Sequence, residues 1–169
     1  MQIEFINYTK DLSCEEQSVF YFEDVTEALA WYSDYMEQYP DDEVGCTYFS
    51  AYGTELVPSV EMLEEFEELA KTHDNQEIEA GCILINYGYD DTLAGALETL
   101  DDRCYFIHGH GKLDAFENYL DEMDYLHGVP EHIRYHIDFD SILRDFECDG
   151  GTIVELGDCW DKFLLINAY

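Results

Sequence analysis

The chain has 169 residues and a formal net charge of −33, because 40 Asp and Glu residues face only seven Lys and Arg residues. An apolar fraction of 47% and an aromatic fraction of 15% predict a folded chain rather than a disordered one. No apolar run is long enough for a transmembrane helix, and no basic, apolar leader follows Met1, so we expect neither an anchor nor a secretion signal. The charge argues against direct binding to nucleic acid or to anionic lipid.

The first third of the sequence is typical of a small α+β domain. Alternating and apolar segments predict strands at 2–8, 17–23 and 46–51. A helix is expected after the second strand, because Asp24 and Glu27 have the spacing of a capping box and apolar residues follow at helical intervals. We therefore assign residues 1–59 to an N-terminal α+β domain.

The middle of the chain is predicted to be helical and acidic. Ser59 is a plausible N-cap for a helix that has apolar residues on one face and glutamates on the other. Residues 77–87 fit a helix or a buried strand equally well, and a short helix is expected after Asp90-Asp91. Residues 60–103 are therefore assigned to a helical middle domain.

The last third is predicted to be a second α+β domain, residues 104–169. Strands are expected at 104–108, 152–156 and 162–167, and helical segments at 112–126 and 131–146, the latter in one or two pieces. The three domains together predict an elongated, three-part α+β architecture.

Cysteine and histidine spacings indicate no metal site and no catalytic site. The six cysteines include no CxxC pair, and most adjoin apolar residues, so we expect buried free thiols in a reducing cytosol. His132 and His136 lack the His-Glu-x-x-His pattern, and His108-Gly-His110 has no third ligand. Residues 145–150 begin like a calcium loop but lack the glutamate at position twelve. We therefore predict a non-enzymatic protein without metal or cofactor.

The distribution of the charge is the strongest functional signal. Seventeen acids and no base lie between Lys10 and Lys71. Like charges at i,i+4, such as Glu61 and Glu65, destabilise a helix, so a compensating function is expected. Three explanations fit: a basic protein partner, a high-salt cytoplasm, or binding of polyvalent cations. The acids that we assign to partner binding are Glu27, Asp34, Glu37, Glu61, Glu64, Glu65, Glu68, Asp114, Glu117, Asp121 and Asp124.

The net charge of the chain is also comparable to the charge carried by a stretch of duplex DNA. Two copies of the chain would carry 66 negative charges, which correspond to roughly 110 Å of duplex at about one charge per 1.7 Å of axis. Such a dimer would present a DNA-like field to a protein with a DNA-binding groove.

Residues 128–146 read Gly-Val-Pro-Glu-His-Ile-Arg-Tyr-His-Ile-Asp-Phe-Asp-Ser-Ile-Leu-Arg-Asp-Phe. This segment resembles the C-terminal signature of the ArdA family of antirestriction proteins. His136 and Leu143 depart from the residues that the family prefers, and the family's N-terminal opening is absent. The residues in register with the signature are Pro130, Ile133, Ile137, Asp138, Phe139, Arg144 and Asp145.

The resemblance implies a curved, three-domain homodimer that mimics bent B-form DNA and occupies the DNA groove of type I restriction–modification enzymes in the host bacterial cytoplasm. It places the family's antirestriction motif at about 116–129, and it implies a dimer contact in the C-terminal domain. The motif residues that we single out are Phe116, Tyr119, Leu120, Met123 and Gly128.

Two alternatives remain open at this point. The chain could inhibit another basic DNA-binding protein or nuclease, or it could be a salt-adapted acidic protein of unrelated function. Within the DNA-mimic interpretation we expect Arg134 and Arg144 to bridge acids internally. Asp138 and Asp145 should serve as their partners or as helix caps, which makes them poor candidates for target contact.

Overall fold

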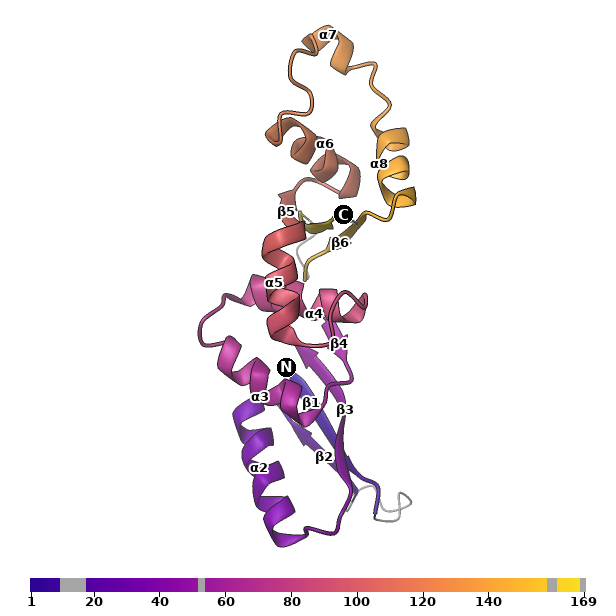
Figure 1. Cartoon of the computed structure of the whole chain (residues 1–169). Coiled ribbons are helices and arrows are strands. Elements are labelled where there is room, and N and C mark those ends of the chain that lie inside the picture. Colours follow the sequence, from indigo (N-terminus) through magenta and orange to yellow (C-terminus); the bar gives the residue numbers. More distant parts are fainter. Residues whose placement is uncertain (10–17, 52–53, 158–160, 168–169) are drawn as a thin grey trace. The chain divides into compact units, whose positions relative to one another are not determined.

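The computed structural model describes residues 1–9, 18–51, 54–157 and 161–167 (Figure 1). The fold is mixed α+β, as predicted: a small N-terminal sheet with a helix, a helical middle, and a C-terminal sheet with helices. The Cα positions group into two compact units, Met1–Glu98 (unit 1) and Thr99–Tyr169 (unit 2). The predicted boundaries after residues 59 and 103 stay predictions. No described helix is both long enough and apolar enough to cross a membrane.

Unit 1 contains a four-stranded antiparallel sheet with the strand order β2-β1-β3-β4. The three predicted strands are confirmed. The fourth was not predicted, because three residues are too few to show a periodic pattern. The strands are β1 (Gln2–Asn7), β2 (Val19–Phe22), β3 (Val44–Ala51) and β4 (Thr54–Leu56).

One face of this sheet packs on α2 (Val25–Gln38) through aromatic rings. Phe5 is fully buried, and its ring centroid lies 5.6 Å from that of Trp31 and 5.5 Å from that of Tyr32. The ring centroids of Phe20 and Trp31 are 4.3 Å apart. Each such ring pair adds about 0.5–1.5 kcal/mol beyond the burial of its area. The alternation of β1 therefore directs its apolar residues into an aromatic core.

A buried polar network fixes the far end of β1 to α2. The Asn7 amide nitrogen donates to Tyr35 Oη at 2.9 Å and to Asp42 Oδ2 at 2.7 Å, and the Tyr35 hydroxyl donates to Asp42 at 2.9 Å. Asn7 is fully buried, so these bonds are needed to satisfy its amide.

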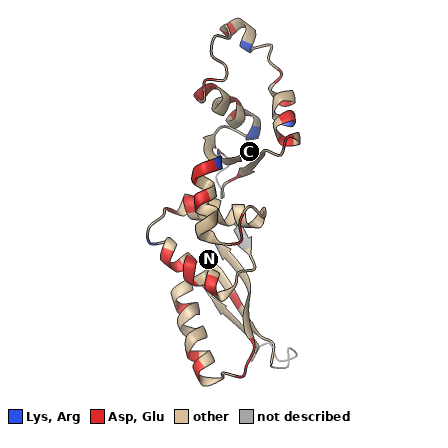
Figure 2. Cartoon of the chain, in the orientation of Figure 1, with Lys and Arg blue, Asp and Glu red and all other residues tan. Residues whose placement is uncertain are grey.

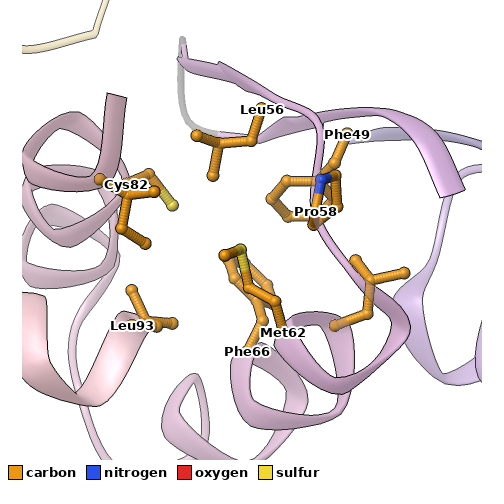
Figure 3. A pocket seen from close by; sticks show the side chains of 9 residues that line it. Phe49, Leu56, Pro58, Met62, Phe66, Cys82 and Leu93 are labelled. Atoms are coloured by element: carbon orange, nitrogen blue, oxygen red, sulfur yellow. The ribbon is translucent and has the colours of Figure 1, made fainter. Parts of the chain in front are cut away.

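The helical middle begins at α3 (Val60–Leu69), where Ser59 accepts a hydrogen bond from Met62 N and confirms the predicted N-cap. The segment 77–87, ambiguous in the sequence, is helical: it belongs to α4 (Asn75–Asn86) up to the C-cap Tyr87, and α4 opens with a capping box formed by Asp74 and Glu77. The next helix is α5 (Leu93–Arg103). A small apolar void remains between α3, α4, α5 and the β3–β4 hairpin, bordered by Met62, Cys82 and Leu93 (Figure 3).

Unit 2 contains a three-stranded antiparallel sheet with the order β5-β7-β6. Its strands are β5 (Cys104–His108), β6 (Thr152–Glu155) and β7 (Lys162–Ile166), and its helices are α6 (Lys112–Glu122), α7 (Glu131–Arg134) and α8 (Phe139–Cys148). Phe116 and Tyr119 of α6 pack in a core with residues from all three strands, and Phe146 of α8 packs against that core.

The predicted helix 112–126 was too long at its C-terminal end, because α6 stops at Glu122. Asp124 has a φ of +60°, and Tyr125 N donates to Leu120 O at 3.0 Å, which is the geometry of a Schellman motif. Asparagine and glycine are more usual than aspartate at that position, so no clear stop signal is present in the sequence.

Candidate functional site

A stripe of carboxylates runs along the exposed side of α2. Glu27, Asp34 and Glu37 are all exposed, whereas Val25 and Ala28 on the other side are buried. The intervals of seven and three residues place the three acids on one side of the helix, over about 15 Å of its axis.

A second stripe runs along α3, which contacts α2. Glu61, Glu64 and Glu68 are exposed, whereas Leu63 and Phe66 are buried. Thr26 Oγ1 of α2 donates to Glu67 Oε1 of α3 at 2.7 Å and ties the two helices together. We call Glu27, Asp34, Glu37, Glu61, Glu64 and Glu68 the α2–α3 acidic face.

Very little positive charge balances this face. Figure 2 shows acidic positions along both helices, and among the described residues the base that pairs with this face is Lys71, whose Nζ lies 2.8 Å from Glu68 Oε1. Both partners of that pair are well exposed, so it contributes little. The face therefore presents a largely uncompensated negative field, which attracts rows of Lys and Arg side chains.

Glu65 has a different role from its neighbours in the sequence. It is half-buried, and its carboxylate accepts hydrogen bonds from Leu93 N at 3.0 Å and Ala94 N at 3.2 Å. It thus caps the N-terminus of α5 from α3, a location that suits a negative charge. The sequence could not show this, because the capped helix lies 28 residues away.

We expect Glu65→Ala to lower the free energy of unfolding by about 1–2 kcal/mol, because two helix-terminal N–H groups lose their acceptor. Glu64→Ala, one residue earlier but exposed, should change it by less than about 0.5 kcal/mol. Urea unfolding followed by circular dichroism measures both. Equal effects of the two substitutions would contradict the capping role.

Two of the four acids predicted for target binding on unit 2, Asp114 and Asp121, are used within the fold, and a third, Asp124, has only an exposed histidine beside it. Asp114 accepts from His110 N at 2.7 Å, Asp121 pairs with Arg134 at 2.5 Å, and Asp124 lies 3.4 Å from His127 Nδ1. Arg134 also donates to the carbonyl oxygens of residues 126 and 129, which confirms its predicted structural role. Asp114 and Asp121 are therefore poorer candidates for target contact than the α2–α3 acidic face.

The fourth acid, Glu117, is half-buried on α6. Burial raises the pKa of its carboxyl group, and repulsion from Asp114 and Asp140 raises it further. The folded chain therefore binds this proton more tightly than the unfolded chain does. The resulting stabilisation is complete below the ordinary pKa of 4.5 and is lost as the pH rises through the raised value.

We accordingly expect Glu117→Gln to melt roughly 1–3 °C above the parent at pH 7 and to lose that advantage near pH 4. Thermal melts of the two proteins at both pH values measure the difference. A difference in melting temperature that is the same at pH 4 and pH 7 would contradict the raised pKa of Glu117.

The residues of the predicted antirestriction motif divide between core and surface. Phe116 and Tyr119 are buried in the core of unit 2, and Leu120 packs against it. Met123 is 42% exposed at the end of α6, and Gly128 has a φ of +76°, which favours glycine. The first three residues therefore support the fold of this region directly.

The signature residues shape the segment from α7 to α8. Asp138 caps α8 by accepting from Ser141 N at 3.1 Å and from Ser141 Oγ at 2.8 Å, as predicted for a helix cap, and these bonds lower the pKa of its carboxyl group. Pro130 precedes α7, and Phe139 begins α8 and is half-buried. Of the remaining signature residues, Ile137 is half-buried, and Ile133, Arg144 and Asp145 are exposed.

Residues 123–142 form an exposed segment in which no residue is buried. Tyr125, Ile133 and Tyr135 are 65%, 44% and 80% exposed. Residues 125–137 contain one acid and one base, so this stretch is nearly neutral in a strongly acidic chain. An exposed apolar surface of this kind is typical of protein–protein contact.

The described cysteines are free thiols, and Cys46 and Cys82 are buried as predicted. The prediction of burial is wrong for Cys148, which is exposed at the end of α8. Burial raises the pKa values of Cys46 and Cys104 to about 11, so both thiols stay protonated at neutral pH. Cys14 and Cys159 lie outside the described residues.

Among the described residues, no group of three or more His, Cys, Asp or Glu side chains is placed to hold a metal ion. The rejected calcium-loop segment begins inside α8, where it cannot form a ligand loop. Comparison with protein-family models and with curated proteins finds no match to this sequence.

Proposed function

We propose that this chain is a non-enzymatic DNA mimic that inhibits type I restriction–modification enzymes by occupying their DNA-binding groove. In this account its carboxylates take the place of phosphates and contact the Lys and Arg side chains of the groove. The host cell's cytoplasm is the compartment in which such an inhibitor would act.

The observation that carries the proposal is the α2–α3 acidic face. Six exposed carboxylates lie on two adjacent helices, and the nearest described base reaches only Glu68. The like charges disfavour the helices on which they stand. Such an arrangement is explained if the face binds a basic surface, where its charges gain partners and release counterions as DNA does.

The resemblance at 128–146 supports the choice of a type I enzyme among basic targets. The structure gives these residues coherent local roles: Asp138 caps α8, and Arg134 joins three parts of unit 2. These roles concern the fold, so the identity of the target rests on the resemblance alone.

We further propose that the protein acts as a homodimer, with residues 123–142 in the contact. Two copies that each have a net charge of −33 repel one another, so they should meet where the surface is least charged. The nearly neutral, apolar stretch 125–137 meets that requirement.

The proposal is tested by cleavage with a purified type I enzyme. The protein is added before the DNA, and ATP-dependent cleavage is followed against protein concentration. Near-stoichiometric inhibition supports the proposal. Unimpaired cleavage with folded protein would overturn the type I assignment and would direct attention to another nuclease or DNA-binding protein.

A further inference from the structure

The face of the unit 1 sheet opposite α2 carries a row of three side chains. Glu4 of β1 pairs with Tyr21 of β2 and with Tyr48 of β3 in the register of the sheet. Residues paired in this way point to the same face, with Cβ atoms about 4.5–5.5 Å apart. Ile3 and Phe5 are buried on the α2 side, so Glu4 between them points to the other face.

A β-bulge holds the central carboxylate in place. The register of β1 and β3 shifts between Glu4 and Phe5, which leaves Thr47 without a paired residue on β1. Thr47 Oγ1 donates to Glu4 Oε1 at 2.7 Å. A carboxylate has about four acceptor positions, so this bond leaves capacity for an incoming donor.

Tyr21, at one end of the row, borders a hollow with further negative charge. Tyr21 is 61% exposed and lines a hollow of about 490 Å³ together with Gln2, Glu23 and Glu27. A positively charged side chain that stacks on Tyr21 would therefore lie near two more carboxylates.

We propose that the Tyr21–Glu4–Tyr48 row is a docking site for an arginine side chain of a basic protein partner. This inference rests on the proposed function, because it supplies one specific contact for the acidic inhibitor. The planar guanidinium group can stack on a tyrosine ring and donate two hydrogen bonds to one carboxylate.

The observations favour arginine over other ligands. Lysine is a point charge that cannot form a bidentate pair with Glu4 in the same way. Nucleic acid bases also stack on exposed aromatic residues, but a carboxylate in the centre of the row and a net charge of −33 repel phosphates. The row therefore fits a partner that is basic and rich in arginine.

The test compares labelled hexa-arginine and hexa-lysine peptides by fluorescence anisotropy with the full chain at about 150 mM salt, a concentration that weakens long-range attraction. We expect the arginine peptide to bind about fivefold more tightly. Tyr21→Ala and Glu4→Gln should each remove most of that preference and leave the lysine peptide's affinity nearly unchanged. Tyr21→Phe, which keeps the ring, should retain the preference.

Tyr87→Ala is the matched control, because Tyr87 is 55% exposed on the same unit but lies outside the row. Equal affinities of the parent for the two peptides, or a preference that survives both Tyr21→Ala and Glu4→Gln, would overturn the docking site. If the preference follows the row but the type I enzyme is not inhibited, the proposed function fails and the site stands. If the type I enzyme is inhibited but the protein shows no preference for the arginine peptide, the docking site fails and the proposed function stands.

Discussion

Replacing the six carboxylates of the α2–α3 acidic face with amides should weaken binding to a type I restriction–modification enzyme by about 100-fold. Each exposed ion pair is worth roughly 0.5 kcal/mol, so six together contribute about 3 kcal/mol. Any single change, such as Glu64→Gln, should cost about twofold or less, because the summed field attracts the partner. Titration of the labelled enzyme with each variant measures the affinities.

A control variant with the same net charge separates the face from the total charge. It replaces six exposed acids outside the face, the predicted motif and the proposed dimer contact with amides: Asp91, Glu98, Asp101, Asp102, Asp149 and Glu155. We expect it to bind much more tightly than the variant of the face. Equal losses would mean that total charge alone matters, and complete loss from one isolated substitution would contradict the distributed field.

Phe5→Ala should have the largest effect on stability, a loss of about 3–5 kcal/mol in the free energy of unfolding. Phe5 is fully buried and contacts Phe22, Trp31 and Tyr32, so its removal leaves a cavity in the centre of the aromatic core. A loss of this size is comparable to the whole stability of many domains.

Urea unfolding of this variant, followed by circular dichroism, measures the loss. Val57→Ala is a suitable control, because Val57 is 77% exposed and its truncation should change stability by less than about 0.5 kcal/mol. A Phe5→Ala protein as stable as the control would show that the core of unit 1 does not depend on the packing described.

Local patterns allowed most of the elements to be predicted from the sequence. The alternation of apolar and polar residues around Phe5 predicted β1, and Ser59 as an N-cap predicted the start of α3. The errors have physical causes: β4 is too short to show a period, and Asp124 ends α6 in a conformation that glycine or asparagine usually adopts.

The candidate site was only partly predictable, because helical periodicity shows which acids share a helix side but not what lies opposite them. It placed Glu61, Glu64 and Glu68 together correctly. It could not show that Glu65 caps α5 or that Asp121 pairs with Arg134, since both contacts join residues far apart in the sequence. The row around Glu4 depends on strand register and likewise had no signal in the sequence.

The most direct test of the central claim is displacement of DNA from a type I restriction–modification enzyme. Labelled duplex is bound to the enzyme, the protein is titrated in, and the titration is repeated at several salt concentrations. DNA mimicry predicts displacement near stoichiometric amounts at low salt, with the inhibitor's affinity falling as salt rises, as it does for phosphate contacts. Duplex that stays bound at low salt, with folded and dimeric protein present, would contradict the account.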